Sequence, residues 1–129
     1  DNLKYNNLDI NGISGGEIPQ YYCITSDGND SFGNIKIKKA SFFDIENPAI
    51  ALTSLAMSNG DLKQLITSGY VQDFTWNWAV PRFTPLFVGG DGNITTEPSQ
   101  VYSIQKIGYV VNASTIFLEF GKKILLNKN

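Results

Sequence analysis

The residues with the clearest potential for chemistry lie in one glycine-rich stretch, Gly89 to Thr95, which reads GGDGNIT. Asp91, Asn93 and Thr95 place oxygen-bearing side chains at alternate positions, which is the ligand spacing of a calcium-binding loop. An EF-hand loop also needs a bidentate glutamate at its twelfth position, and the twelfth position from Asp91 is Tyr102. No Gly-Lys-Ser/Thr sequence follows the glycines to hold a phosphate. We therefore predict a hairpin turn here, with no metal and no cofactor.

Other catalytic chemistries lack the residues that they require. The chain has no histidine, the usual general base and the commonest metal ligand. Its single cysteine, Cys23, lies in the apolar run YYCIT without a histidine to activate it, so we interpret it as a buried hydrophobic residue. The carboxylates are dispersed, and most of them adjoin turn residues or prolines. We predict that the chain is not an enzyme; a hydrolase would need a site shared between subunits.

A row of aromatic residues is the remaining candidate for a binding function. Residues 71–80, VQDFTWNWAV, alternate cleanly, which predicts a strand with Phe74, Trp76 and Trp78 on one face. If that face is buried, the three rings belong to the core, which is where large aromatic side chains contribute most. If it is exposed, the rings form a platform for sugar rings or a contact between subunits. The candidate contact residues are Trp76, Trp78, Phe74 and Tyr70.

Composition restricts the class of protein and its partners. The chain has 129 residues, 42% of them hydrophobic and 17% charged, which is typical of one folded globular domain. The net charge is −2, with a single arginine and no basic stripe, so nucleic-acid binding is not expected. No segment approaches the roughly 20 apolar residues of a membrane-spanning helix, so membrane insertion is not expected either.

Short strands separated by turns make up most of the chain. After Pro19, turn signals recur about every eight to twelve residues, a spacing typical of all-β sandwiches and barrels. Residues 34–40, for example, alternate isoleucine and lysine, which indicates a half-buried strand. We predict a single antiparallel β-sandwich or barrel of about 8–10 short strands over residues 21–129. Residues 1–20 show no sustained periodicity, and we interpret them as an extended linker or oligomerisation arm.

Three segments resemble a β-domain found in virion appendage proteins of bacteriophages, which include tail fibres, head fibres and decoration proteins. The segments are PAIALTSLAMSNGDLKQLITSGYV, FTPLFVGGDGNITTEP and IQKIGYVVNASTIFLEF. The residues that match the family pattern are Ala51 and Leu52, Gly69 to Val71, Pro85 to Val88, Gly92 to Thr95, Pro98, and Gln105 to Val110. Within this alignment Ala51 stands where glycine is common, and Thr84 stands where a glycine often precedes the proline.

The resemblance implies a structural part of a phage particle, exposed on the virion surface. It implies assembly as a homo-oligomer, expected to be a homotrimer, together with other virion proteins. Contact with a glycan on the host cell surface is also consistent with such a part. The alternative that we keep open is a carbohydrate-binding adhesion module that uses Trp76 and Trp78.

Overall fold

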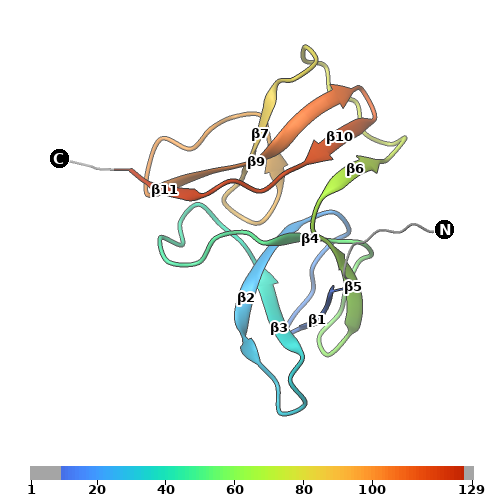
Figure 1. Cartoon of the computed structure of the whole chain (residues 1–129), viewed down its shortest axis with the longest axis vertical. Helices are drawn as coiled ribbons and strands as arrows, with labels where there is room; N and C mark the ends of the chain where they lie inside the picture. The colour runs from blue at the N-terminus through green and yellow to red at the C-terminus, as the bar shows by residue number, and fades with distance from the viewer. Residues whose placement is uncertain (1–9, 127–129) are drawn as a thin grey trace.

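Eleven short strands and no helix make up the computed structural model, which describes residues 10–126. Five strands form a closed barrel and six form a second sheet packed against it (Figure 1). The barrel strands are β1 (Ile10–Ser14), β2 (Cys23–Asn29), β3 (Ile35–Lys39), β4 (Ala51–Thr53) and β5 (Leu62–Ile66). The sheet strands are β6 (Gly69–Gln72), β7 (Pro85–Val88), β8 (Ile94–Thr95), β9 (Ser103–Asn112), β10 (Thr115–Leu118) and β11 (Lys123–Leu125). The prediction of an all-β barrel or sandwich is confirmed.

The barrel closes because β1 pairs with strands on both of its sides. The strand order is β1-β3-β2-β4-β5, and β5 pairs with β1 to complete the ring. The β1–β3 pair is parallel, with Gly12 opposite Ile35, so the predicted purely antiparallel arrangement is wrong at this pair. Side chains of Ile18, Ile24, Ile37, Ala51, Met57 and Leu65 fill the interior of the barrel.

The segment interpreted as an N-terminal arm divides at residue 10. Residues 1–9 lie outside the described part of the chain. Residues 10–14 form barrel strand β1, and Ile18 forms a β-bridge with Met57 and is buried. The asparagines and glycines of this segment give no local strand pattern. Its strand is determined by pairing partners that lie far away in the sequence.

The second sheet is organised around its longest strand, β9. The order is β6-β10-β9-β7-β8, and β11 also pairs with β9. The registers of β9 with β10 and of β9 with β7 each shift once, which places β-bulges on both sides of Gly108. Gly108 has φ +156°, and a Cβ atom there would lie 2.0 Å from the Phe117 carbonyl oxygen. A glycine is therefore required where β9 and β10 approach each other this closely.

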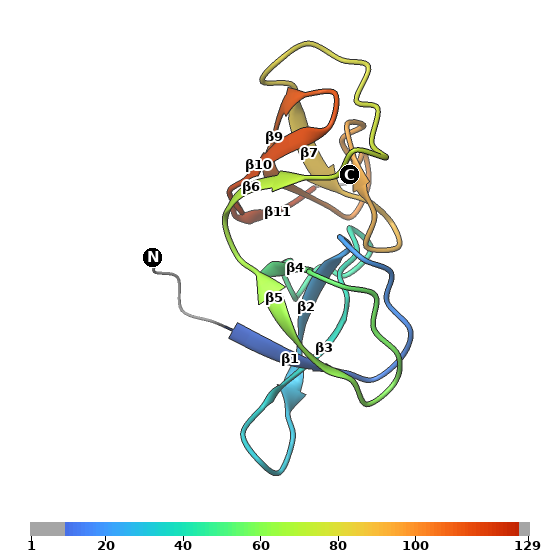
Figure 2. The same cartoon turned by 90° about the vertical axis from the view of Figure 1, so that its right-hand side faces the viewer.

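One hydrophobic core is shared between the barrel and the sheet. The barrel side contributes Cys23, Ala40, Ala49 and Leu52, and the sheet contributes Val71, Leu86, Val88, Ile107, Val110, Ile116 and Leu118. Figure 2 shows β5 of the barrel leading directly into β6 of the sheet across this junction. Because the two layers bury the same cluster of side chains, each depends on the other for its stability.

The predicted strand over residues 71–80 is wrong beyond Gln72. Strand β6 ends there, since its partner β10 begins at Thr115, opposite Gln72. The Asp73 carboxylate then accepts hydrogen bonds from the backbone N–H and the hydroxyl of Thr75, at 2.9 and 2.7 Å. Such local side-chain bonds favour a turn over a continued strand. Residues 73–80 are consequently a loop, and the aromatic side chains in it do not share a strand face.

Candidate functional site at the junction of barrel and sheet

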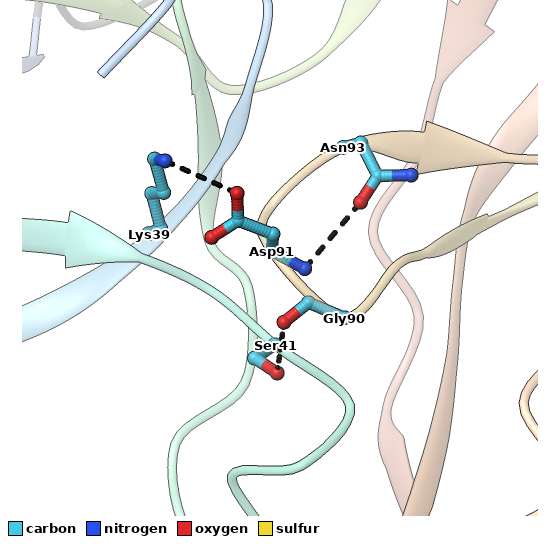
Figure 3. A network of polar contacts seen from close by, with 5 residues as sticks. All are labelled: Lys39, Ser41, Gly90, Asp91 and Asn93. Atoms are coloured by element: carbon cyan, nitrogen blue, oxygen red, sulfur yellow. Dashed lines mark hydrogen bonds and ion pairs between the residues drawn. The ribbon is translucent and has the colours of Figure 1, made fainter. Parts of the chain in front are cut away.

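The glycine-rich turn between β7 and β8 fastens the sheet to the barrel. The Ser41 hydroxyl donates to the Gly90 carbonyl at 2.7 Å, and Lys39 forms an ion pair with Asp91 at 3.3 Å (Figure 3). The backbone N–H of Cys23 donates to the Gly92 carbonyl at 2.7 Å. The Asp91 side chain is 77% exposed, so its ion pair contributes at most about 1 kcal/mol. The predicted hairpin turn is confirmed, and its polar groups bind other parts of the same chain.

Gly92 is the residue that allows this turn to lie so close to the start of β2. Its φ is +82°, in the left-handed region, and a Cβ atom would lie 3.0 Å from the Cys23 carbonyl oxygen. Within residues 10–126, no group of three or more His, Cys, Asp or Glu side chains is arranged to hold a metal ion.

Beside this turn lies a small cavity, which we call the junction pocket. Three segments line it: residues 20–22 before β2, residues 73–78 after β6, and the start of β8. Its volume is about 190 Å³, and the lining residues are Gln20, Tyr21, Tyr22, Asp73, Trp76, Trp78, Asn93 and Ile94. The pocket therefore combines four aromatic rings with three polar side chains and exists only where barrel and sheet meet.

The aromatic rings of the junction pocket are packed against one another. The ring centroids of Tyr21 and Trp76 are 5.3 Å apart, and those of Trp76 and Trp78 are 5.7 Å apart, both pairs in tilted geometry. All three rings are half-buried against the shared core. The indole nitrogen of Trp78 is buried but has no hydrogen-bond partner among the residues that the structure describes. Buried indole N–H groups usually find an acceptor, so this one is an exception that needs an explanation.

The other two predicted contact residues lie outside the junction pocket. Phe74 is 83% exposed in the loop after β6. Tyr70 is 70% exposed on β6 and packs against Phe117 of β10, with ring centroids 4.9 Å apart. The four candidate residues thus occupy three separate places, and only Trp76 and Trp78 lie together.

A row of four aromatic rings, which we call the aromatic row, begins at Tyr70 and crosses the sheet. It was not predicted from the sequence. Tyr70, Phe117, Tyr109 and Phe83 form successive ring contacts with centroid distances of 4.9, 5.4 and 5.4 Å. Phe117 stands opposite both Tyr70 and Tyr109 in the strand registers, so the row follows from cross-strand pairing. Its four members come from four separate segments, and only the pairing of β6, β10 and β9 brings them together.

A buried glutamine organises the opposite side of the junction. The Gln105 amide accepts from the Ala49 backbone N–H at 2.8 Å and donates to the Ala49 and Gly121 carbonyls at 3.0 and 2.9 Å. Nearby, the Lys123 ammonium donates to the carbonyls of Ser41 and Asp44. Burial lowers the pKa of Lys123, against the opposing effect of the Asp44 charge. These contacts hold residues 41–49 on the sheet and serve the fold.

The described residues define an all-β class of protein in which a closed five-stranded barrel shares its core with a six-stranded sheet. Among solved structures, the chain is similar to the N base of the head fibre gp8.5 of bacteriophage phi29. The TM-score is 0.52 with 16% sequence identity, over 93% of this chain and 98% of that chain. No protein-family model and no curated protein sequence matches the chain. The likeness in fold agrees with the architecture that the sequence resemblance implied.

Proposed function

We propose that this protein is a structural β-domain of a phage virion appendage of the head fibre type. The observation that carries the proposal is the fold shared with the phi29 head fibre N base, which extends over nearly the full length of both chains. The local chemistry agrees with it, because the polar residues of the glycine-rich turn bind the barrel of the same chain. A close-packed core shared between barrel and sheet also gives the domain the rigidity that a structural part needs.

Location in the particle is the direct test of this proposal. Antibodies raised against the purified domain should label the surface of phage particles isolated from cultures that carry its gene, viewed by negative-stain electron microscopy. Mass spectrometry of the same particles after gradient purification should recover its peptides. Purified particles that contain none of its peptides would overturn the proposal.

The proposed appendage domain assembles as a homotrimer, and the aromatic row is the surface that we assign to the contact. Tyr70 and Phe83 are 70% and 65% exposed, and aromatic side chains are enriched at interfaces between subunits. Sedimentation velocity at micromolar concentration should show a trimer for the native chain. The double variant Tyr70→Ser with Phe83→Ser should sediment as a monomer, while Phe32→Ser, at an exposed hairpin tip, should remain trimeric. A native chain that is monomeric at these concentrations would contradict the assignment.

Contact with a glycan of the host surface is the second candidate function. The observation that favours it is the junction pocket, where Tyr21, Trp76 and Trp78 stand beside the polar side chains of Gln20, Asp73 and Asn93. Aromatic faces combined with a few placed polar groups are the usual composition of small-ligand sites.

A further inference from the structure

We infer that the aromatic row of one subunit packs on a second exposed apolar surface of the next subunit, so that the homotrimer closes as a head-to-tail ring. This inference rests on the proposed homotrimer and deepens it, because it names the partner of the aromatic row. In a ring of head-to-tail contacts, each subunit presents two different surfaces to its two neighbours. The aromatic row is one of these surfaces, and the chain carries a suitable second one.

The second surface lies at the end of β11 and consists of Phe43, Ile45, Tyr102 and Leu125, which we call the β11 patch. Each of these four side chains is at least 50% exposed. The rings of Phe43 and Tyr102 are in contact, with centroids 5.3 Å apart. The Leu126 N–H donates to the Tyr102 carbonyl at 3.0 Å, which holds Tyr102 beside β11. Large apolar side chains that gather in one exposed place are typical of an interaction surface.

The aromatic row and the β11 patch lie on different sides of the molecule. The row begins on β6, which is the outermost strand at one end of the order β6-β10-β9-β7-β8. In Figure 1, β6 lies on the right-hand side of the sheet and β11 on the left-hand side. One subunit can therefore present the row to one neighbour and the patch to the other.

A pocket in the β11 patch has room for an aromatic ring of the neighbouring subunit. Its volume is about 550 Å³, and its apolar walls include Ile45, Ala49 and Leu125. This volume lies within the range of pockets that accept whole drug-sized molecules, so the ring of Phe83 fits. Phe83 has φ 72°, in the left-handed region, and its N–H donates to the Val110 carbonyl at 2.7 Å. Such strained residues are concentrated at functional sites, and aromatic anchors in pockets contribute most of the energy of many interfaces.

The two surfaces also carry complementary charges. Arg82, the single arginine of the chain, is exposed beside Phe83, and its guanidinium carbon lies 6.0 Å from the centre of that ring. Glu46 is exposed and lines the pocket of the β11 patch. With Phe83 in the pocket of the next subunit, Arg82 comes to the rim where Glu46 lies. Opposite charges at a rim fix the register of an interface.

The lysines of the pocket leave Glu46 available to a cation of the neighbouring subunit. Lys122 and Lys123 both line the pocket, but neither forms an ion pair with Glu46 within residues 10–126. The Lys123 ammonium instead donates to the carbonyls of Ser41 and Asp44.

Removal of the β11 patch is the first test. The double variant Ile45→Ser with Leu125→Ser should sediment as a monomer at the micromolar concentration that tests the native trimer, because the aromatic row loses the surface that covers it. Leu55→Ser, whose side chain is 52% exposed in the loop after β4, is the matched control and should remain trimeric. Circular dichroism establishes that the double variant is folded. A folded double variant that stays trimeric would overturn the inference and leave the homotrimer intact, whereas a monomeric native chain would refute both.

Charge reversal tests the register without removing apolar area. Arg82→Glu and Glu46→Arg should each raise the concentration of half-assembly by about tenfold or more, because each places like charges opposite each other. The variant that carries both substitutions should return to within about threefold of the native value, because its charges are again opposite. Two single effects that simply add in the combined variant would show that Arg82 and Glu46 do not meet.

Disulfide cross-linking distinguishes a head-to-tail ring from three aromatic rows that meet at a central axis. Copies with Arg82→Cys are mixed with copies with Glu46→Cys and oxidised with diamide, while the native Cys23 is fully buried. Non-reducing electrophoresis should show a covalent dimer in the mixture and none with either variant alone. Cross-linking of Arg82→Cys with itself would place the rows together at the axis and overturn the inference.

Discussion

At the scale of single residues, Gln105 illustrates how one buried amide can replace several backbone contacts. Its side chain is 2% exposed and satisfies both polar groups of Ala49 as well as the Gly121 carbonyl. Ala49 belongs to the shared core, and its segment has no strand partner of its own at this point. Gln105 of β9 therefore supplies the segment 41–49 with hydrogen bonds that a neighbouring strand would otherwise make.

We expect Gln105→Leu to lower the free energy of unfolding by about 1–3 kcal/mol. The variant retains apolar volume but leaves the buried N–H and carbonyl of Ala49 without partners, and each unsatisfied group carries a desolvation cost. Urea unfolding followed by circular dichroism measures the change. Gln100→Leu, at an exposed position, is the matched control and should lie within about 0.5 kcal/mol of the native chain. Equal stabilities of the two variants would contradict the role given to Gln105.

At the scale of elements, β9 shows what the residues of the segment IQKIGYVV do in the fold. Along this strand Gln105 binds Ala49, Ile107 and Val110 enter the shared core, and Tyr109 joins the aromatic row. Gly108 lies between the two register shifts and permits the close approach of β10. Five positions of the segment thus have identified physical tasks, which include core packing, ring contact and a close approach of two strands.

Gly108→Ala should destabilise the protein by at least about 2 kcal/mol. The added methyl group would meet the Phe117 carbonyl oxygen at 2.0 Å, and the unfavourable φ adds strain, so β9 and β10 must separate locally. Equilibrium unfolding in urea measures the loss. Gly16→Ala is the control, because a Cβ atom there would meet nothing within 4 Å. If both alanine variants had native stability, the bulge would not require glycine.

Strands and turns marked by local residue patterns were predictable from the sequence, whereas elements determined by pairing with distant strands were not. The alternation of Ile35 and Ile37 with lysines marks β3 correctly, and the glycines at 89–92 mark the β7–β8 turn. Strand β1 has no comparable local pattern, because its pairing with β3 and β5 determines it. Residues 71–80 alternate like a strand, but the carboxylate of Asp73 and the limited length of β10 turn them into a loop.

The same distinction holds for the candidate site. Trp76 and Trp78 were identifiable by residue type, because large aromatics with polar neighbours are typical of both cores and sugar sites. Gln20 and Tyr21 complete the pocket from more than 50 positions before Trp76, and Asn93 from 15 positions after Trp78. Only the packing of the barrel on the sheet brings them together.

At the scale of the whole molecule, the shared core predicts that barrel and sheet unfold together. Cys23 tests this, because it lies at the barrel side of that core and is fully buried. Burial raises the pKa of the Cys23 thiol to about 12, which leaves very little reactive thiolate at pH 8. We expect iodoacetamide to label Cys23 in the native protein at least about 10³-fold more slowly than in urea, measured by mass spectrometry.

The Gly108→Ala variant extends this test from one layer to the other. Its substitution lies in the sheet, yet a shared core means that it should accelerate labelling of Cys23 in the barrel. Gly16→Ala should leave the labelling rate unchanged. An unchanged rate in both variants would indicate that the barrel opens independently of the sheet.

The closed barrel also has a consequence for folding while the chain is being synthesised. Ile10 pairs with Leu65, so all five barrel strands have been synthesised, and can begin to pair, before any part of the sheet exists. Leu52 and Cys23 then lack the cover that Ile107, Ile116 and Leu118 later supply. About 50 more residues must be synthesised to provide it, which takes roughly 3–10 s at 5–20 residues per second. For that interval the nascent barrel presents an apolar face, and chaperone binding or premature association during translation is expected there.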